Sequence, residues 1–249
     1  MRLKGDEKAR YVAAMFDGIS RRYDMMNTVM TGGMHHVWRR RATALATQNG
    51  EGEAPSTGSG QALDVATGTG DFALDLARRP GISQVVGLDF APQMLPLARK
   101  KAQRRKLSHR VHWLLGDALA LPFPDDHFLC TTVGFGLRNF HDKEAALKEM
   151  TRVVKPRGRV VILDILPSTG TGTGPVHRLF RLYFRGVVPR LGALLAGNKE
   201  AYTYLPDSVD SYLTAQELAA LMESVGLQGV RYQMMGLGTV ALHVGEKGG

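Results

Sequence analysis

The sequence predicts an α/β fold in which a Rossmann-like, mostly parallel sheet ends in an antiparallel hairpin. From residue 61 to residue 165, short apolar runs typical of strands alternate with amphipathic runs typical of helices. This alternation favours a parallel sheet with helices on both faces. Near the end of the chain, a helix predicted for 214–225 precedes two strand candidates, 229–234 and 239–244, with only residues 235–238 between them. So short a connection requires a hairpin, and one strand must therefore be antiparallel.

The individual elements follow from apolar periodicity and from residues that start or stop helices. Strands are predicted for the apolar runs 61–66, 84–89, 111–115, 130–135 and 159–165. Helices are predicted for the longer runs 71–78, 93–106 and 142–153, and Thr214 is a good N-cap for the helix before the hairpin. Near the N-terminus, apolar residues at helical spacing predict helices that pack onto the rest of the chain: Val12, Met15, Phe16, Ile19 and Tyr23.

Local composition divides the chain into three parts. Residues 48–60 are rich in Gly, Ser and Pro, which is typical of a flexible linker that cannot hold a packed core. We therefore expect a helical cap at 1–47 and a main domain at 61–249, in which 167–205 form an insert or lid.

Overall composition limits the class of protein. At 249 residues and 44% hydrophobic, the chain can bury a sizeable core, and its formal net charge of +9 favours an anionic partner: nucleic acid, an acidic lipid surface or an acidic substrate. The one cysteine, Cys130, lies in an apolar run, so no disulfide can form within the chain and a reducing compartment is expected. The charged N-terminus lacks a secretory signal, and no run of about 20 apolar residues could cross a bilayer.

A glycine-containing loop follows the first predicted strand of the main domain and opens into a helix. Gly68 and Gly70 can take backbone conformations closed to other residues and let a ligand approach the main chain. Asp89 ends the next predicted strand, where a carboxylate can accept hydrogen bonds from both hydroxyls of a ribose. The pattern predicts a nucleoside pocket.

Two further acids help to choose the nucleoside. The glycines also satisfy the looser dinucleotide pattern G-x-G-x-x-A. Asp64 before the loop and Asp71 at the helix start disfavour a pyrophosphate and suit a cation, although strand-end and capping roles explain either acid alone equally well. S-adenosylmethionine carries an amino group and a sulfonium and has no phosphate. We therefore expect the class I S-adenosylmethionine-dependent methyltransferase fold, with the cofactor bound by Asp64, Gly68, Gly70 and Asp89.

In open sheets of this type, ligands bind outside the carboxyl ends of the strands. Asp117 and Ala118 follow the third predicted strand and can contact an adenine, through the carboxylate and the main chain respectively. A turn-capping role for Asp117 is equally compatible with its position. The strand end at 134–139 belongs to the same edge of the sheet.

Several segments form longer motifs. The most specific is YDMMN at 23–27, which continues through Thr31 to His35 and Trp38; others are LPFPD at 121–125, GFGLRN at 134–139 and RVVKP at 152–156. Two more lie towards the C-terminus, YTYLP at 202–206 and VALH at 240–243. With these segments the chain resembles the ubiquinone/menaquinone biosynthesis C-methyltransferases, and within them the demethylmenaquinone methyltransferases. It departs from the family pattern at Leu129, Arg157, Asp164, Leu166 and the Ser/Thr/Gly-rich stretch 167–175, on the substrate side.

The resemblance implies both a cofactor site and a reaction. It implies S-adenosylmethionine contacts from Thr69, Asp89, Asp117, Ala118 and Gly134. It also implies methylation of a ring carbon of a polyprenylated quinol, with demethylmenaquinol as the leading substrate and a polyprenyl benzoquinol of ubiquinone biosynthesis as the nearest alternative.

An aromatic carbon is a poor nucleophile, so a base and a group that stabilises the oxyanion would both help. Arg138 is our candidate for holding the quinol oxygen, because it is always charged and follows a strand end that faces the cofactor; a surface ion pair is the alternative. Asn139 would orient the same oxygen. Eligible bases are His35, His141, Tyr202 and Tyr204. The expected catalytic set is Arg138, Asn139, His35 and Tyr204.

Partners follow from the remaining patterns. The basic amphipathic run 177–195 predicts a helix that either lies on an anionic membrane or packs on the core as a substrate lid, so we expect a cytoplasmic protein with peripheral membrane contact as an option. An RNA methyltransferase is the competing enzyme class, but its motifs are missing and we expect no nucleic acid. No metal is expected, because His35 and His36 diverge on a helix and no third ligand is suitably spaced. The sequence leaves open whether the chain forms a homo-oligomer.

Overall fold

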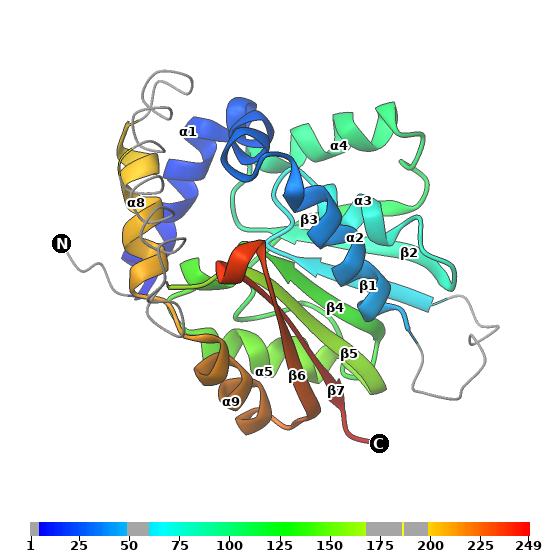
Figure 1. Ribbon diagram of the computed structural model, residues 1–249. Helices are drawn as coiled ribbons and strands as arrows, with labels where there is room; N and C mark the ends of the chain where they lie inside the picture. The colour runs from blue at the N-terminus through cyan, green and yellow to red at the C-terminus, as the bar shows by residue number, and fades with distance from the viewer. Residues whose placement is uncertain (1–4, 49–59, 168–185, 187–198) are drawn as a thin grey trace.

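A seven-stranded sheet in the order β3-β2-β1-β4-β5-β7-β6 lies at the centre of the molecule (Figure 1). The computed structural model describes residues 5–48, 60–167, 186 and 199–249. The strands are β1 Gly60–Val65, β2 Ile82–Asp89, β3 Val111–Leu115, β4 Phe128–Gly134, β5 Val154–Ile165, β6 Leu227–Met235 and β7 Val240–Lys247. The helices are α1 Gly5–Thr31, α2 Met34–Ala46, α3 Asp71–Leu76, α4 Met94–Arg104, α5 Lys143–Val153, α8 Lys199–Asp210 and α9 Ala215–Ser224, with short 3₁₀ turns η1 Leu137–Asn139 and η4 Gly236–Gly238.

The sheet topology confirms the predicted fold. Strands β1 to β5 pair in parallel, whereas β7 is antiparallel to both β5 and β6 and closes the sheet as a hairpin. Strand β1 pairs with β2 on one side and with β4 on the other, so the connections leave β1 in opposite directions. Ligands of open α/β sheets bind at such a switch point, outside the carboxyl ends of the strands.

Local signals explain most of the element boundaries. The side chain of Asp142 accepts a hydrogen bond from the Ala145 backbone N–H (2.9 Å) and caps α5, and Thr214 forms a capping box with Glu217 at the start of α9. Strand β5 begins earlier than the apolar run suggests, because an irregular register lets the polar residues before Arg159 continue the strand. Helix α8 was not predicted, since Pro206 lies inside it.

Apolar residues form one core on each face of the sheet. One cluster joins the strands to α5 and α9, through residues such as Phe128, Leu147 and Leu218. The other joins them to α2 and α3, through residues such as Trp38 and Phe72. Helix α2 therefore packs on the sheet itself. The predicted linker and the predicted helix at 177–195 fall largely or wholly outside the described residues, so the division into cap, linker and main domain stays a prediction.

Helix α1 packs against α8 over the carboxyl edge of the sheet (Figure 1). Met15, Ile19 and Met26 bury their side chains with Val209 of α8. Among the helices that the structure describes, none combines the length and the apolar character needed to span a bilayer.

A polar cluster fastens α1 to the glycine loop. The Asp24 carboxylate accepts a hydrogen bond from the Thr69 hydroxyl (2.6 Å) and lies 2.6 Å from the Lys101 ammonium. Lys101 also donates to the Thr69 hydroxyl (2.9 Å) and lies 3.1 Å from Asp71. We call Asp24, Thr69, Lys101 and Asp71 the α1 latch. A single exposed ion pair contributes little, but one ammonium shared by three oxygen atoms couples α1, α4 and the loop.

If the α1 latch holds the helix in place, breaking it should increase the local opening of α1. Lys101→Met should raise amide hydrogen exchange in residues 15–30 several-fold while leaving the central strands protected, because it removes the cation between two carboxylates. Exchange measured by mass spectrometry tests this, with exposed Arg104→Met on the same helix as the matched control. Unchanged exchange in α1 would contradict the assigned role of the latch.

Candidate functional site

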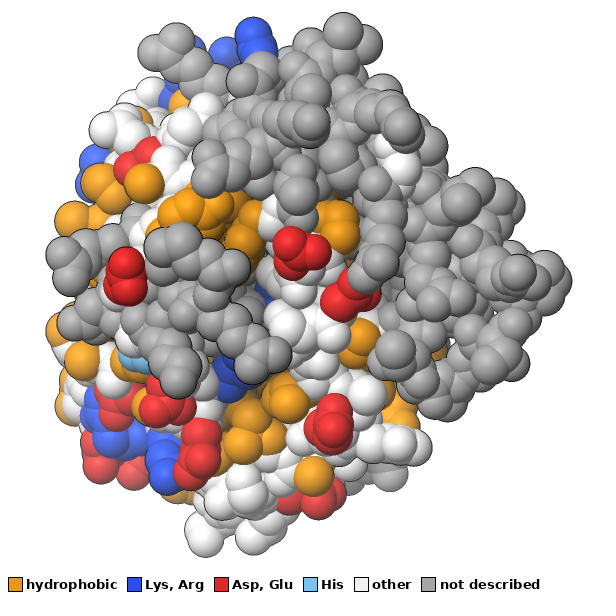
Figure 2. Space-filling view, turned by 90° about the vertical axis from the view of Figure 1, so that its left-hand side faces the viewer, with side chains coloured by type: hydrophobic (Ala, Val, Ile, Leu, Met, Phe, Trp, Pro, Cys, Tyr) orange, Lys and Arg blue, Asp and Glu red, His pale blue; other side chains and the backbone are white. Residues whose placement is uncertain are grey.

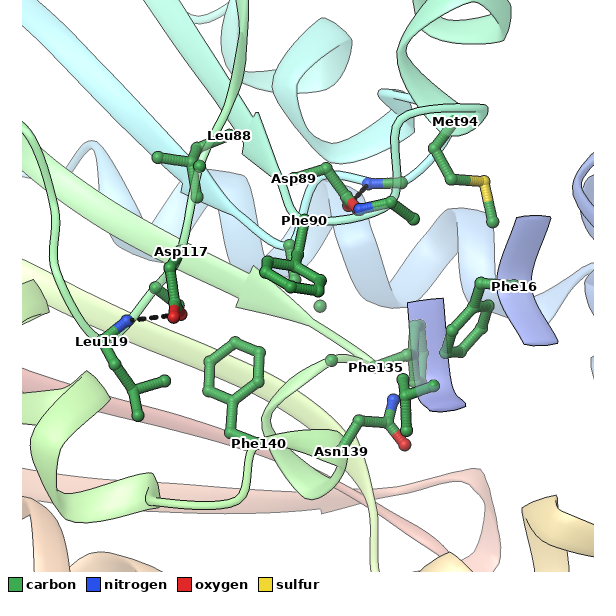
Figure 3. Close-up of a pocket in the computed structure, with 18 of the residues that line it drawn as sticks. Phe16, Leu88, Asp89, Phe90, Met94, Asp117, Leu119, Phe135, Asn139 and Phe140 are labelled. Atoms are coloured by element: carbon green, nitrogen blue, oxygen red, sulfur yellow. Dashed lines mark hydrogen bonds between the residues drawn. The ribbon is translucent and has the colours of Figure 1, made fainter. Parts of the chain in front are cut away.

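A cavity of about 820 Å³ opens at the carboxyl ends of β1, β2, β3 and β4, beneath α1 (Figure 3). We call it the first cavity. Its walls combine two acids with many apolar groups, including Val12, Phe16, Leu88, Asp89, Phe90, Met94, Asp117, Leu119, Phe135 and Phe140. Figure 3 shows the rings of Phe90 and Phe140 between Asp117 on one side and Phe16 on the other. The cavity thus offers apolar surface for a flat ring, with carboxylates beside it.

Gly68 and Gly70 must be glycine for different physical reasons. Gly68 has φ +56°, and a Cβ there would meet no atom within 4 Å, so its glycine keeps the cavity side open. Gly70 has φ +82°, and a Cβ there would collide with the Trp113 ring. Gly70 therefore serves the packing of β3 against the loop, and it is absent from the cavity wall.

Asp89 is the acid best placed to bind a sugar. It is 8% exposed, ends β2 and lines the first cavity. Its Oδ2 accepts from the Gly68 N–H (2.6 Å) and its Oδ1 from the Ala91 N–H (2.8 Å), which fixes the carboxylate while leaving a lone pair on each oxygen. Burial raises the pKa of Asp89, although both backbone donors favour its ionised form.

The other expected cofactor residues divide into two groups. Gly68, Asp117, Ala118 and Gly134 line the first cavity together with Asp89. Asp117 also accepts from the Leu119 N–H (3.0 Å), so it caps its turn and faces the cavity at once. Thr69 belongs to the α1 latch and does not line the cavity.

Asp64 lies beneath the glycine loop instead of on the cavity wall. It is 1% exposed and accepts hydrogen bonds from the Thr67 hydroxyl (2.6 Å), the Thr132 hydroxyl (2.7 Å) and the Ala73 N–H (3.1 Å). Burial raises its pKa to about 7. These contacts tie both ends of the loop to β1 and β4, so we propose that Asp64 acts on the ligand through the loop.

A second cavity of about 970 Å³ adjoins the first. Its walls come from α1, α2, η1, β5, β7 and α8, and they are mainly apolar: Met15, Phe16, Ile19, Met30, Trp38, Phe135, Ile165 and Val240. All the expected catalytic residues line it, namely His35, Arg138, Asn139 and Tyr204. His141 lines the first cavity instead, and the side chain of Tyr202 lies outside the described residues.

The two cavities share a wall. Phe16 and Tyr23 from α1, Phe135 after β4 and Asn139 of η1 line both. The two cavities are therefore neighbours at these side chains, and direct contact between a group in each requires an opening between the side chains. The sequence placed Phe16 and Tyr23 on one helical face, but periodicity alone does not show what that face covers.

Arg138 is buried beside this wall. Its guanidinium Nη1 lies 2.7 Å from Oδ1 of Asp164, and Nη1 also donates to the Phe135 carbonyl. Although burial disfavours the charged form, the Asp164 carboxylate raises the pKa of Arg138 above its usual value. Arg138 is thus a buried cation with a dedicated counter-ion.

His35 is neutral, and its contacts with Thr31 favour one tautomer. The Thr31 hydroxyl donates to the Asn27 carbonyl (2.7 Å), so toward His35 Nδ1, also 2.7 Å away, it can only accept. Nδ1 therefore carries the proton and Nε2 carries a lone pair. Burial, with a further contribution from nearby Arg39, lowers the pKa of His35 to about 4.

The phenols near the shared wall are donors. Burial raises the pKa values of Tyr23 and Tyr204, so both stay protonated at neutral pH. The Tyr204 hydroxyl donates to Oδ1 of Asn139 (3.3 Å), which leaves the Asn139 amide N–H groups for a ligand. Among the described histidine and tyrosine side chains that line the second cavity, His35 is therefore the one that can accept a proton at neutral pH.

Known proteins resemble this chain over most of its length. The model of the ubiE/COQ5 methyltransferase family matches residues 4–247. A demethylmenaquinone methyltransferase of Thermus thermophilus is 46% identical over 233 residues, covering 94% of this chain and 100% of that protein. A ubiquinone/menaquinone biosynthesis C-methyltransferase of Ruegeria sp. is 34% identical over 243 residues, covering 97% and 92%. A solved SAM-dependent methyltransferase from Thermotoga maritima, titled a possible histamine N-methyltransferase, has a TM-score of 0.62 at 17% identity over 94% of this chain and 98% of its own, and shares the fold.

The His35 geometry can be measured directly. Nitrogen-15 NMR should find Nδ1 protonated in the neutral ring and a pKa near 4, whereas Thr31→Val should lose the preference for that tautomer because the acceptor is gone. A His35 pKa between 6 and 7, or the same tautomer in both proteins, would contradict this assignment.

Proposed function

The chain belongs to the ubiE/COQ5 methyltransferase family and is an S-adenosylmethionine-dependent methyltransferase, and we propose that it methylates a ring carbon of demethylmenaquinol in menaquinone biosynthesis. The observation that carries the proposal is the shared wall between the two cavities. One cavity has the acids and the flat apolar surface suited to the methyl donor. The other is apolar, with hydrogen-bonding groups at the wall, as a prenylated quinol needs.

The first cavity fits the donor by its charges and its shape. Asp89 and Asp117 line it, and none of its described lining residues is a lysine or arginine that would pair with a phosphate. The Asp89 oxygens would accept from the ribose hydroxyls, and Leu88, Phe90 and Leu119 offer surface to an adenine. S-adenosylmethionine supplies, when bound, an electrophilic methyl group on a sulfonium centre.

The second cavity fits a neutral acceptor. Arg138 is paired with Asp164, Arg39 is paired with Asp75 at 3.2 Å, and His35 is neutral. No lysine or arginine among the described lining residues is therefore free to attract an anionic substrate. A quinol with a hydrocarbon tail meets these conditions, whereas a carboxylate or a phosphate does not.

The residues at the wall can activate the acceptor. We propose that Arg138 and Asn139 donate hydrogen bonds to the quinol oxygen next to the reacting carbon and stabilise the oxyanion that develops there. Nε2 of His35 would accept the hydroxyl proton as the ring carbon takes the methyl group and the neutral thioether leaves. The hydrogen on the methylated carbon is then lost as a proton and the oxygen is protonated again, which restores the quinol. A base with a pKa near 4 is weak, so proton removal would accompany formation of the carbon–carbon bond instead of preceding it. The apolar walls would favour loss of the sulfonium charge during transfer.

The relatives favour a naphthoquinol over a benzoquinol. Proteins named demethylmenaquinone methyltransferase are 46% and 44% identical to this chain, whereas the one from Ruegeria with the broader ubiquinone/menaquinone name is 34% identical. A polyprenyl benzoquinol remains the second candidate, because both quinols present the same hydroxyl and ring carbon.

An RNA substrate has less support. On the face shown in Figure 2, acidic side chains lie among basic ones, and the described residues there form no continuous basic surface. The net charge of +9 is also compatible with an anionic membrane, from which a polyprenyl substrate would enter. We propose peripheral contact at the cytoplasmic face, where exposed Met34 and Val37 at the start of α2 flank residues that line the second cavity.

The reaction is tested with purified protein and radiolabelled S-adenosylmethionine. Demethylmenaquinol should gain one methyl group on the ring, with a higher kcat/KM than a polyprenyl benzoquinol. Methyl transfer to RNA, without transfer to either quinol, would overturn the proposal.

Separate roles for the two cavities predict separable defects. Asp89→Ala should weaken S-adenosylhomocysteine binding about 100-fold, since charge-assisted hydrogen bonds to two hydroxyls are lost. Arg138→Gln should leave that Kd within about twofold and lower kcat about 10- to 100-fold, the equivalent of one charge-assisted hydrogen bond. Calorimetry and steady-state kinetics distinguish these outcomes, with surface Asp126→Ala as the control. Equal loss of donor binding in both variants would contradict the two-cavity assignment.

A further inference from the structure

Asp164 contacts Arg138 through both of its carboxylate oxygens. It lies next to the last residue of β5 and is 1% exposed. Its Oδ1 lies 2.7 Å from Nη1 of Arg138 and its Oδ2 accepts from the Arg138 backbone N–H at 3.2 Å. The Ile165 N–H donates to Oδ1 at 2.9 Å and fixes the carboxylate in turn. One carboxylate thus holds both the main chain and the side chain of Arg138.

The guanidinium is left with one buried donor unused. Nη1 is occupied by Asp164 and by the Phe135 carbonyl, whereas Nε is buried and has no hydrogen-bond partner within the described part of the chain. A buried donor without a partner is destabilising, and because the Arg138 side chain lines the second cavity, a ligand oxygen bound there is a candidate for the missing acceptor.

We propose that Asp164 is a positioning residue, which fixes the Arg138 guanidinium so that Nε is presented to the acceptor oxygen. The proposal rests on the proposed function, in which Arg138 contacts the quinol. Asp164 touches neither substrate in this account and acts through Arg138 alone. Its fixed carboxylate pre-organises the donor, and the donor need not reorient as negative charge develops on the oxygen.

The pair also sets the charge of the acceptor site. Because Asp164 neutralises Arg138, the cavity carries no net charge from this pair and suits a neutral quinol with a hydrocarbon tail. An N–H group of Arg138 still remains to donate to the oxyanion as it develops. A lone arginine would bind the anionic form of the acceptor more tightly, and it would equally attract unrelated anions. The carboxylate therefore contributes to selectivity as well as to orientation.

The first test compares Asp164→Asn with the parent enzyme. The amide keeps the size of the side chain but removes its charge, so kcat should fall about 10- to 100-fold, the loss expected when one charge-assisted hydrogen bond is misplaced. S-adenosylhomocysteine affinity should stay within about twofold. In an Arg138→Gln background, the same substitution should cause almost no further loss, because Asp164 would have nothing left to position. Additive losses in the double variant would overturn the proposal.

Two further variants separate positioning from stability. Glu246→Gln is the matched control, since Glu246 pairs with buried Arg159 (2.7 Å) between β7 and β5, away from both cavities; kcat should be unchanged. Asp164→Glu keeps the charge and moves the carboxylate by one methylene. Its kcat should fall by more than the fraction of protein that its lowered melting temperature leaves unfolded at the assay temperature. Parent-like kcat in Asp164→Glu together with parent-like kcat in Asp164→Asn would overturn the proposal.

A measurement that needs no turnover separates the positioning role of Asp164 from the proposed function. In the parent protein, the Arg138 Nε–H should give a sharp nitrogen-15 NMR resonance that shifts when a naphthoquinone analogue is added, and Asp164→Asn should broaden it. A resonance unaffected by the substitution would overturn the positioning role. If the parent methylates neither quinol but the resonance still depends on Asp164, the proposed function fails and the positioning of Arg138 stands.

Discussion

The packing of α1 across the carboxyl edge of the sheet is the constraint on which the site depends. Phe16 and Tyr23 of this helix line both cavities, so neither cavity has its full wall without α1. The helix is held by apolar contacts with α8 and by the α1 latch at the glycine loop. Because Thr69 of the latch adjoins Gly68 in the first cavity, the position of α1 and the shape of the donor site are physically linked.

The charges that line the two cavities suit them to different ligands. The first presents Asp89 and Asp117 and suits a cation without phosphate. In the second, Asp164 and Asp75 neutralise the two arginines, and burial keeps His35 uncharged. In the proposed function, these charges would direct a positively charged donor to the first cavity and a neutral, apolar acceptor to the second. The loss of sulfonium charge during transfer is favoured by apolar surroundings at the shared wall.

The sequence predicted much of the fold, because alternating apolar runs and the close C-terminal hairpin are local signals. It also placed Gly68, Asp89 and Asp117 at strand ends, which follow from chain order, and these residues line the first cavity. It could not tell which way side chains near the loop point: Thr69 turns to α1 and Asp64 turns beneath the loop. Contacts between distant residues, such as Tyr204 with Asn139 or Asp164 with Arg138, depend on tertiary packing that no local pattern contains.

The central proposal is that donor and acceptor meet where the two cavities adjoin, beside Phe16, Tyr23, Phe135 and Asn139. A crystal structure of the ternary complex with S-adenosylhomocysteine and a naphthoquinone analogue tests it most directly. The account predicts the thioether sulfur in the first cavity beside Tyr23 and Asn139, facing a quinone ring in the second. A quinone bound outside the second cavity, or a sulfur directed away from that wall, would contradict it.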